Sequence, residues 1–199
     1  MKKTISAALA IATLMGANAQ TEVLRIELTD GTVRTVPVES IKEMTFGEEE
    51  EPEEPTLAEQ TAGTYSGTNT VVVGGNFSYT ADCTCEITAN ADGTVNFTWN
   101  QYSLKGTVMG DLTLGTCTIS DIAWDEAQGG FYRDYSNDGV MQHFTAEKDG
   151  TTSMDKDYEL GATSTILIEM TEGGIKVTNP FKLGAMPLPL TATFEGGKQ

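Results

Sequence analysis

Apolar and polar residues alternate along most of the chain from Gly63 onward, and short glycine-containing turns interrupt the alternation. Successive side chains of a β-strand point to opposite faces, so a period of two predicts strands with one buried face. The alternation is strictest between positions 77 and 87, where every second residue is apolar or aromatic: Phe77, Tyr79, Ala81, Cys83, Cys85 and Ile87.

Eight runs have this strand character, and no run in this part of the chain has a convincing helical pattern. Eight antiparallel strands fit an up-and-down barrel or a sandwich, and closure is favoured because it removes exposed sheet edges. The predicted fold class is therefore all-β, a roughly eight-stranded antiparallel up-and-down barrel preceded by a short β-hairpin and an acidic linker. The predicted strands are 65–73, 77–87, 95–99, 112–119, 140–146, 163–170, 175–181 and 188–194.

The first nineteen residues have the three parts of a secretory signal peptide. Lys2 and Lys3 precede an apolar run over 5–15, and Ala17-Asn18-Ala19 supplies the small-residue cleavage site, whereas a buried N-terminal helix would have no use for that ending. Cleavage after Ala19 leaves Gln20 first, so no cysteine is available for a lipid anchor. No later run approaches the roughly 20 apolar residues of a membrane-spanning helix. We therefore expect a soluble periplasmic or secreted protein.

Residues 20–46 predict a β-hairpin. Two runs rich in β-branched residues flank Asp30-Gly31, a strong hairpin signal because Gly31 accepts a positive φ. An isolated two-stranded hairpin is marginally stable in water, so this one is expected to dock on the barrel domain, on another hairpin or on a protein partner that adds to its edge.

Residues 47–60 predict an extended linker, because 47–55 contains six glutamates and two prolines and nothing apolar to bury. The barrel domain is then assigned to 61–199. The chain has 12 Lys and Arg against 29 Asp and Glu, a net charge of −17, which argues against binding to nucleic acid or to anionic membranes. Much of this acidity lies in the linker, so it does not demand a cationic ligand. A tail that binds cations or a polybasic partner is the alternative interpretation of the linker.

The three cysteines are expected to be buried free thiols. Cys83 and Cys85 share one face of a strand but lie about 6.6 Å apart along it, too far for a disulfide. Cys117 could bridge only to a directly neighbouring strand. A three-thiolate metal site is a weaker alternative, since Cys-x-Cys lacks the spacing of zinc sites.

Several short motifs resemble the calycin-like, lipocalin-related β-barrel domain of exported Gram-negative proteins, with the likeness covering about 61–197. The resemblance implies an eight-stranded barrel whose lumen has the capacity to hold a small apolar ligand, and it carries over no catalytic residues. The hairpin is similar to a short segment that precedes the main module in such proteins. Residues 125–138 and 147–161 are longer and more acidic than barrel hairpins need, and they are expected to be mouth loops or irregular strands. The motifs are Tyr65-Ser66-Gly67-Thr68, the stretch 87–94, Tyr102-Ser103-Leu104, Met186-Pro187-Leu188 and Thr193-Phe194-Glu195-Gly196.

Aromatic residues supply the candidate ligand-binding site. One group falls on the inward face of the predicted strands, and the other lies in an aromatic, charged segment expected to form a mouth loop. The alternative is that the first group simply fills the core and that the loop packs as a lid. The candidates are Tyr65, Phe77, Tyr79, Phe97 and Trp99 on the strands, and Trp124, Phe131 and Tyr132 in the loop.

No catalytic or cofactor motif is present. His143 is the single histidine, no G-x-S-x-G occurs, and a strand histidine facing solvent is the simplest interpretation. Asp155, Asp157 and Glu159 alternate on one strand face and could offer oxygens to Ca²⁺, but they lack the spacing of an EF-hand loop. We expect no cofactor and assign no metal site.

Two functions remain open. The first is a non-enzymatic binding module that holds a small apolar or amphipathic molecule in the barrel lumen or mouth. The alternative is a structural or protein-interaction module, with a side-chain-filled barrel displaying loops. An enzyme ranks third, because no spacing of acids selects a catalytic pair.

Overall fold

The computed structural model describes residues 22–28, 30–43, 54–184 and 188–199. The predicted signal peptide, the first half of the acidic linker (47–53), and Met186 and Pro187 lie outside the described residues. The chain divides into two compact units, Met1–Glu53 and Glu54–Gln199. None of the helices described in either unit is both long and apolar enough to span a bilayer.

The N-terminal unit contains the predicted hairpin, which is confirmed. Strand β1 (Val23–Glu27) pairs antiparallel with β2 (Val33–Pro37), and a 3₁₀ turn, η1 (Val38–Ser40), follows. Gly31 has a φ of +83°, and the Asp30 carboxylate accepts a hydrogen bond of 2.8 Å from the Thr32 amide. The turn is therefore stabilised by the Asp30 side chain and by the positive φ that Gly31 accepts.

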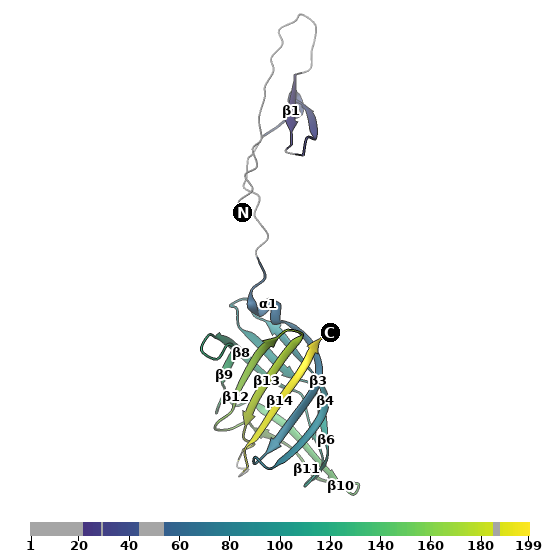
Figure 1. Ribbon diagram of the computed structural model, residues 1–199, viewed down its shortest axis with the longest axis vertical. Coiled ribbons are helices and arrows are strands. Elements are labelled where there is room, and N and C mark those ends of the chain that lie inside the picture. The colour runs from purple at the N-terminus through teal and green to yellow at the C-terminus, as the bar shows by residue number, and fades with distance from the viewer. Residues whose placement is uncertain (1–21, 29, 44–53, 185–187) are drawn as a thin grey trace, which may run out of the picture. The chain divides into compact units, whose positions relative to one another are not determined.

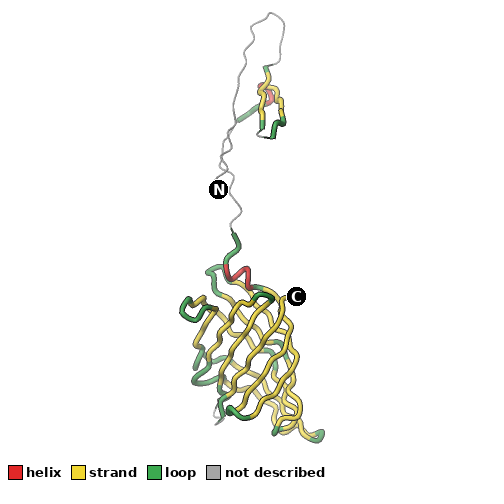
Figure 2. The backbone as a smooth tube through the Cα atoms, in the orientation of Figure 1, coloured by secondary structure: helices red, strands yellow, loops and turns green. Residues whose placement is uncertain are grey.

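Eight antiparallel strands of the second unit close into a barrel, as predicted (Figures 1 and 2). Seven of the eight pairings around the barrel join barrel strands that are consecutive in the chain. The eighth closes the barrel, because the last strand, Leu190–Lys198, pairs with residues 65–73 of the first. Closure leaves the barrel without a free edge strand. In order around the barrel, the strands are β3 (Gly63–Val73), β4 (Phe77–Ala89), β5 (Val95–Trp99), β8 (Cys117–Asp125), β9 (Gly130–Asp134), β12 (Thr165–Thr171), β13 (Gly174–Phe181) and β14 (Leu190–Lys198).

Two hairpins inserted into the barrel sequence form a second sheet. The first, β6 (Tyr102–Thr107) and β7 (Gly110–Leu114), lies between β5 and β8 in the chain. The second, β10 (Met141–Lys148) and β11 (Thr151–Glu159), lies between β9 and β12. They pair through β7 and β10, giving a four-stranded sheet in the order β11-β10-β7-β6.

The structure changes four assignments made from the sequence, those of two predicted strands and of the two long acidic segments. The expected single strand over 112–119 is wrong, because the chain leaves one sheet after Leu114 and enters the barrel at Cys117. Between them, Gly115 donates its amide to the carbonyl oxygen of His143, and a Cβ at this glycine would lie 3.0 Å from the His143 Cβ. The run over 140–146 forms a strand of the second sheet instead of the barrel. The two long acidic segments contain regular strands, β9 and β11.

A five-residue helix, α1 (Leu57–Thr61), precedes the barrel strands and spans the boundary between the range assigned to the linker and that assigned to the barrel domain. Thr56 and Glu59 form a reciprocal capping box, in which each side chain accepts the other's backbone N–H. Ala58 and Thr61 are buried, and the Tyr65 hydroxyl donates to the Thr61 carbonyl at 2.6 Å. The helix therefore packs at the end of the barrel where β3 begins (Figure 1).

Candidate functional site

The barrel lumen is filled by aromatic side chains. Phe97 and Trp99, both on β5, meet edge to face with ring centroids 4.8 Å apart. Phe194 comes from β14 and meets Trp99 in the same geometry at 5.8 Å. Tyr65 and Val71 of β3 are also buried here. These rings interdigitate at the separations that aromatic pairs favour, so they form a packed core.

Polar side chains inside the core satisfy one another. The side-chain amide nitrogen of Asn179, on β13, donates hydrogen bonds to the hydroxyl of Tyr135 and to the carbonyl oxygen of Thr165, both at 2.7 Å. The indole nitrogen of Trp99 donates to the Asn179 amide oxygen at 3.4 Å. Burial raises the pKa of Tyr135, although the hydrogen bond from Asn179 opposes the shift. This network ties three barrel strands to the segment that follows β9.

Asn69 on β3 is the exception in the core. It is fully buried, and neither of its amide atoms makes a hydrogen bond of ordinary geometry. Burial raises the pKa of the nearby Tyr102 hydroxyl, and the Asn69 amide opposes that shift. Among the buried side chains of the described residues, Asn69 is thus left with unsatisfied amide atoms.

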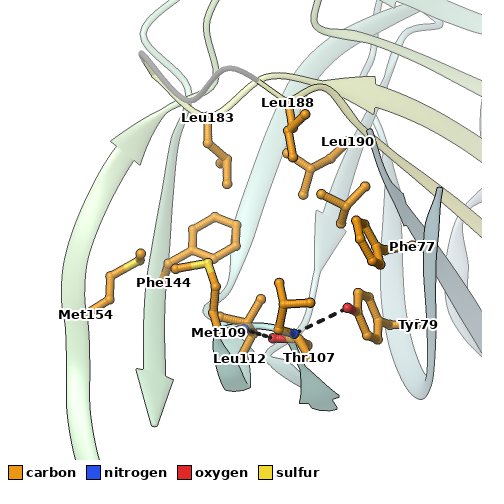
Figure 3. A pocket seen from close by; sticks show the side chains of 12 residues that line it. Phe77, Tyr79, Thr107, Met109, Leu112, Phe144, Met154, Leu183, Leu188 and Leu190 are labelled. Carbon is orange, nitrogen blue, oxygen red and sulfur yellow. Dashed lines mark hydrogen bonds between the residues drawn. The ribbon is translucent and has the colours of Figure 1, made fainter. Parts of the chain in front are cut away.

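An apolar pocket of about 90 Å³ lies between one end of the barrel and the second sheet (Figure 3). The barrel side supplies the ends of β3, β4 and β14 and the segment after β13. The second sheet supplies the β6–β7 turn and parts of β7, β10 and β11. The lining residues are Val73, Phe77, Tyr79, Leu183, Leu188 and Leu190 from the barrel, and Thr107, Val108, Met109, Leu112, Phe144 and Met154 from the second sheet.

The pocket combines a covered floor with an exposed apolar rim. Phe144 and Leu183 are almost completely buried, whereas Val108, Phe77 and Leu188 are 67%, 46% and 44% exposed. Figure 3 shows Phe77 and Tyr79 facing Phe144 and Met154 across the pocket. None of the lining residues carries a charge. The arrangement suits a molecule that buries an apolar part in the cavity and remains reachable from solvent.

The structure separates the residues predicted from the sequence into three places. Phe77 and Tyr79 line this pocket, whereas Tyr65, Phe97 and Trp99 lie in the barrel core. The other three lie around the β8–β9 turn, at the opposite end of the barrel. There Trp124 packs edge to face on the buried Phe131 at 5.4 Å, beside the half-buried Tyr132.

Sequence reasoning missed the second sheet's share of the pocket. Val108 and Met109 offered a signal, because two large apolar residues between Gly106 and Gly110 have no reason to occupy a glycine turn unless they contact something. Met154 gave no such signal, since it sits in an acidic strand and reaches the pocket only because its hairpin, β10–β11, pairs with the distant strand β7.

The model of the calycin-like β-barrel domain matches residues 61–197. The chain belongs to the calycin-like β-barrel family. Among solved structures it is similar to a putative outer membrane protein from Bacteroides fragilis, with 20% sequence identity and a TM-score of 0.47 over 98% of this chain and 74% of that chain. No curated protein matches the chain.

The thiols of this calycin-like barrel are free and buried. Cys83 and Cys85 lie on β4, and Cys117 lies on β8. Strand β5 separates these two strands, because Trp99 pairs with Cys85 on one side and with Cys117 on the other. The condition for a Cys117 bridge, a directly neighbouring strand, is therefore not met. Burial raises the pKa of Cys83 to about 12 and that of Cys117 to about 11.

The histidine of the calycin-like domain lies on the exposed face of the second sheet, as predicted. Its Nδ1 is 2.8 Å from an Asp157 carboxylate oxygen, and its Nε2 is 3.2 Å from one of Asp155. Two of the three acids considered for Ca²⁺, Asp155 and Asp157, thus contact His143. Across residues 22–28, 30–43, 54–184 and 188–199, no group of three His, Cys, Asp or Glu side chains is arranged to hold a metal ion.

Proposed function

We propose that this calycin-like protein is an exported, non-enzymatic binding module that holds a small apolar or amphipathic molecule in the pocket between the barrel end and the second sheet. One observation carries the proposal: an uncharged, apolar cavity opens through a rim on which Phe77, Val108 and Leu188 remain exposed. Monomeric soluble proteins seldom leave a contiguous apolar surface uncovered without a binding role.

The proposal places the ligand at the barrel mouth and not in the lumen. Phe97, Trp99 and Phe194 occupy the lumen, and displacing any of them would break packed aromatic contacts. The pocket instead uses the outer end of the barrel. Its second wall comes from the β6–β7 and β10–β11 insertions, which the barrel itself does not need for closure.

Binding is tested by titrating the full mature chain with N-phenyl-1-naphthylamine, a dye whose fluorescence rises in apolar sites. We expect Phe77→Ser to weaken dye binding about fivefold to tenfold, because it removes part of an apolar wall. Leu57→Ser is the matched control, since Leu57 is similarly exposed on α1 at the other end of the barrel. An unchanged affinity in Phe77→Ser, or an equal loss in both variants, would contradict the proposed site.

Export is the part of the proposal that rests on sequence alone. If the signal peptide is cleaved after Ala19 in a Gram-negative host, the mature chain begins at Gln20. Intact-mass measurement of the periplasmic fraction tests this, and a product retaining Met1 in the cytoplasm would overturn it.

A second candidate function is protein binding through the hairpin. Val23, Val33 and Val38 are each more than 40% exposed there, and among the described residues the outer edges of β1 and β2 pair with no further strand. A partner's extended segment could add to either edge. Hydrogen exchange on the isolated full chain tests the need for a partner. Rapid exchange of the amides in β1 is expected, and slow exchange would count against this function.

A further inference from the structure

The lining of the apolar pocket contains two hydroxyl groups, those of Thr107 and Tyr79, and they differ in whether the hydroxyl proton is already donated within the protein. Thr107 Oγ1 donates to the carbonyl of Gly110 at 2.6 Å and accepts the amide of Met109 at 3.1 Å. The Thr107 hydroxyl proton is therefore committed within its own turn. Such a group holds the β6–β7 turn in shape but has no proton for a ligand.

Tyr79 is different. Its hydroxyl oxygen accepts a hydrogen bond from the amide of Val108 at 3.3 Å, across the gap between the barrel and the second sheet (Figure 3). A phenol has one proton to donate in addition to its acceptor oxygen. Within the described parts of the chain, no acceptor takes that proton. The contact lies at the exposed rim of the pocket, because Val108 is 67% exposed.

Charge restricts what can meet this donor. The lining residues are uncharged, and the chain carries a net charge of −17. Three lysines adjoin lining residues in the sequence: Lys182 is next to Leu183, Lys105 is two residues from Thr107, and Lys156 is two residues from Met154. None of them is itself a lining residue; the Lys105 ammonium pairs with Asp111 at 3.0 Å, and that of Lys156 lies 4.5 Å from the Tyr158 ring centroid. An anionic head group would therefore lose hydration without gaining a partner charge.

Together these observations point to a ligand class. Building on the proposed function, we propose that the pocket selects an uncharged amphiphile, with an alkyl chain in the cavity and an acceptor oxygen at the rim that receives the Tyr79 hydroxyl proton. Tyr79 is then the specificity-determining residue of the site. Its phenol would bridge the Val108 amide and the ligand oxygen, so binding would also fasten the β6–β7 turn to the barrel.

The test uses displacement of the naphthylamine dye from the full mature chain by hexan-1-ol, hexanoate and hexane at neutral pH. Tyr79→Phe removes the phenol proton and keeps the ring. We expect this variant to bind hexan-1-ol about threefold to tenfold more weakly and to bind hexane unchanged, because one hydrogen bond is lost. Wild-type protein should bind hexan-1-ol more tightly than hexanoate.

Tyr132→Phe is the matched control, because it removes a tyrosine hydroxyl at the opposite end of the barrel. Near-ultraviolet circular dichroism confirms that both variants fold. An equal loss of hexan-1-ol and hexane binding in Tyr79→Phe would overturn the role of the hydroxyl, and tighter binding of hexanoate would overturn the uncharged class. Both results leave the apolar pocket itself standing. If neither the dye nor any of the three compounds binds wild-type protein, the proposed function fails as well.

Discussion

Phe194 and Trp99 meet edge to face across the barrel lumen, with ring centroids 5.8 Å apart, although they lie 95 residues apart in the chain. The contact joins the last strand of the barrel to β5 and places two large rings at its centre. Phe97 also packs on Trp99, with ring centroids 4.8 Å apart, so three aromatic rings occupy this part of the lumen.

Removing this ring should destabilise the protein far more than removing a ring from the pocket. Phe194→Ala is expected to lower the free energy of unfolding by about 3–5 kcal/mol, because it leaves a cavity in a packed core. Phe77→Ala should cost about 1 kcal/mol or less, because nearly half of Phe77 is already exposed. Urea denaturation followed by tryptophan fluorescence measures both. Equal losses would mean that the lumen is not packed as described.

Gly196 allows the same ring to fold over its own strand. A Cβ at this position would overlap the ring of Phe194 and the carbonyl oxygen of Ser66. Gly196→Ala is therefore expected to lower the free energy of unfolding by about 1–3 kcal/mol. Gly173→Ala is the control, since nothing lies within 4 Å of a Cβ there. Thermal denaturation compares the two, and a harmless Gly196→Ala would contradict the placement of Phe194.

The Asn179 network should show coupling in a double-mutant cycle. Asn179→Ala is expected to cost about 2–4 kcal/mol of unfolding free energy, because it leaves buried groups of Tyr135 and Trp99 without partners. In a Tyr135→Phe background the same change should cost less, because one of those orphaned groups is already gone. Denaturant titration of the four proteins gives the coupling energy, and simple additivity would argue against the shared hydrogen bond.

The buried thiols should make the protein less stable in alkali. In Cys117 the folded-state pKa of about 11 lies above its ordinary value of 9.0, so the folded protein holds the thiol proton more tightly than the unfolded chain. The contribution is complete below pH 9.0 and is lost as the pH rises toward 11. At pH 10 this loss amounts to about 1 kcal/mol for one such thiol.

Comparison of wild-type protein with Cys117→Ala isolates that contribution from other titrating groups. The variant's unfolding free energy should fall less between pH 8 and pH 10, by about 1 kcal/mol. Parallel pH profiles would show that burial does not shift this thiol. As an independent check, all three cysteines should resist alkylation at pH 8 until the protein unfolds, because only the thiolate reacts.

Local rules explain what could be predicted for this fold. The hairpin at Asp30-Gly31 and the strand faces of 77–87 follow from turn chemistry and from a period of two, both of which act between near neighbours. The eight-stranded count also emerged, although two of the predicted strands were assigned incorrectly. Short helix α1 was missed because its capping box, Thr56 to Glu59, stands beside a long acidic run that obscures it.

The site depended on pairings that the sequence does not display. Alternation placed Phe77, Tyr79, Phe97 and Trp99 on inward faces alike, but it did not say how far along the barrel each would lie. Phe77 and Tyr79 extend past the packed lumen at the beginning of β4, where the second sheet faces them, and so they line a pocket. Phe97 and Trp99 sit at the level of Phe194 and fill the core.

By itself, then, the amino-acid sequence determined that this chain forms strands with defined inner faces, a hairpin ahead of them and an acidic segment between. Only the tertiary structure decided that two inserted hairpins pair with each other through β7 and β10, and that their sheet builds one wall of a pocket. The physical reason is that side-chain alternation is a property of each strand alone, whereas strand pairing is chosen by contacts between segments far apart in the chain. The pocket forms only where strand faces set by side-chain alternation are brought together by the pairing of distant segments.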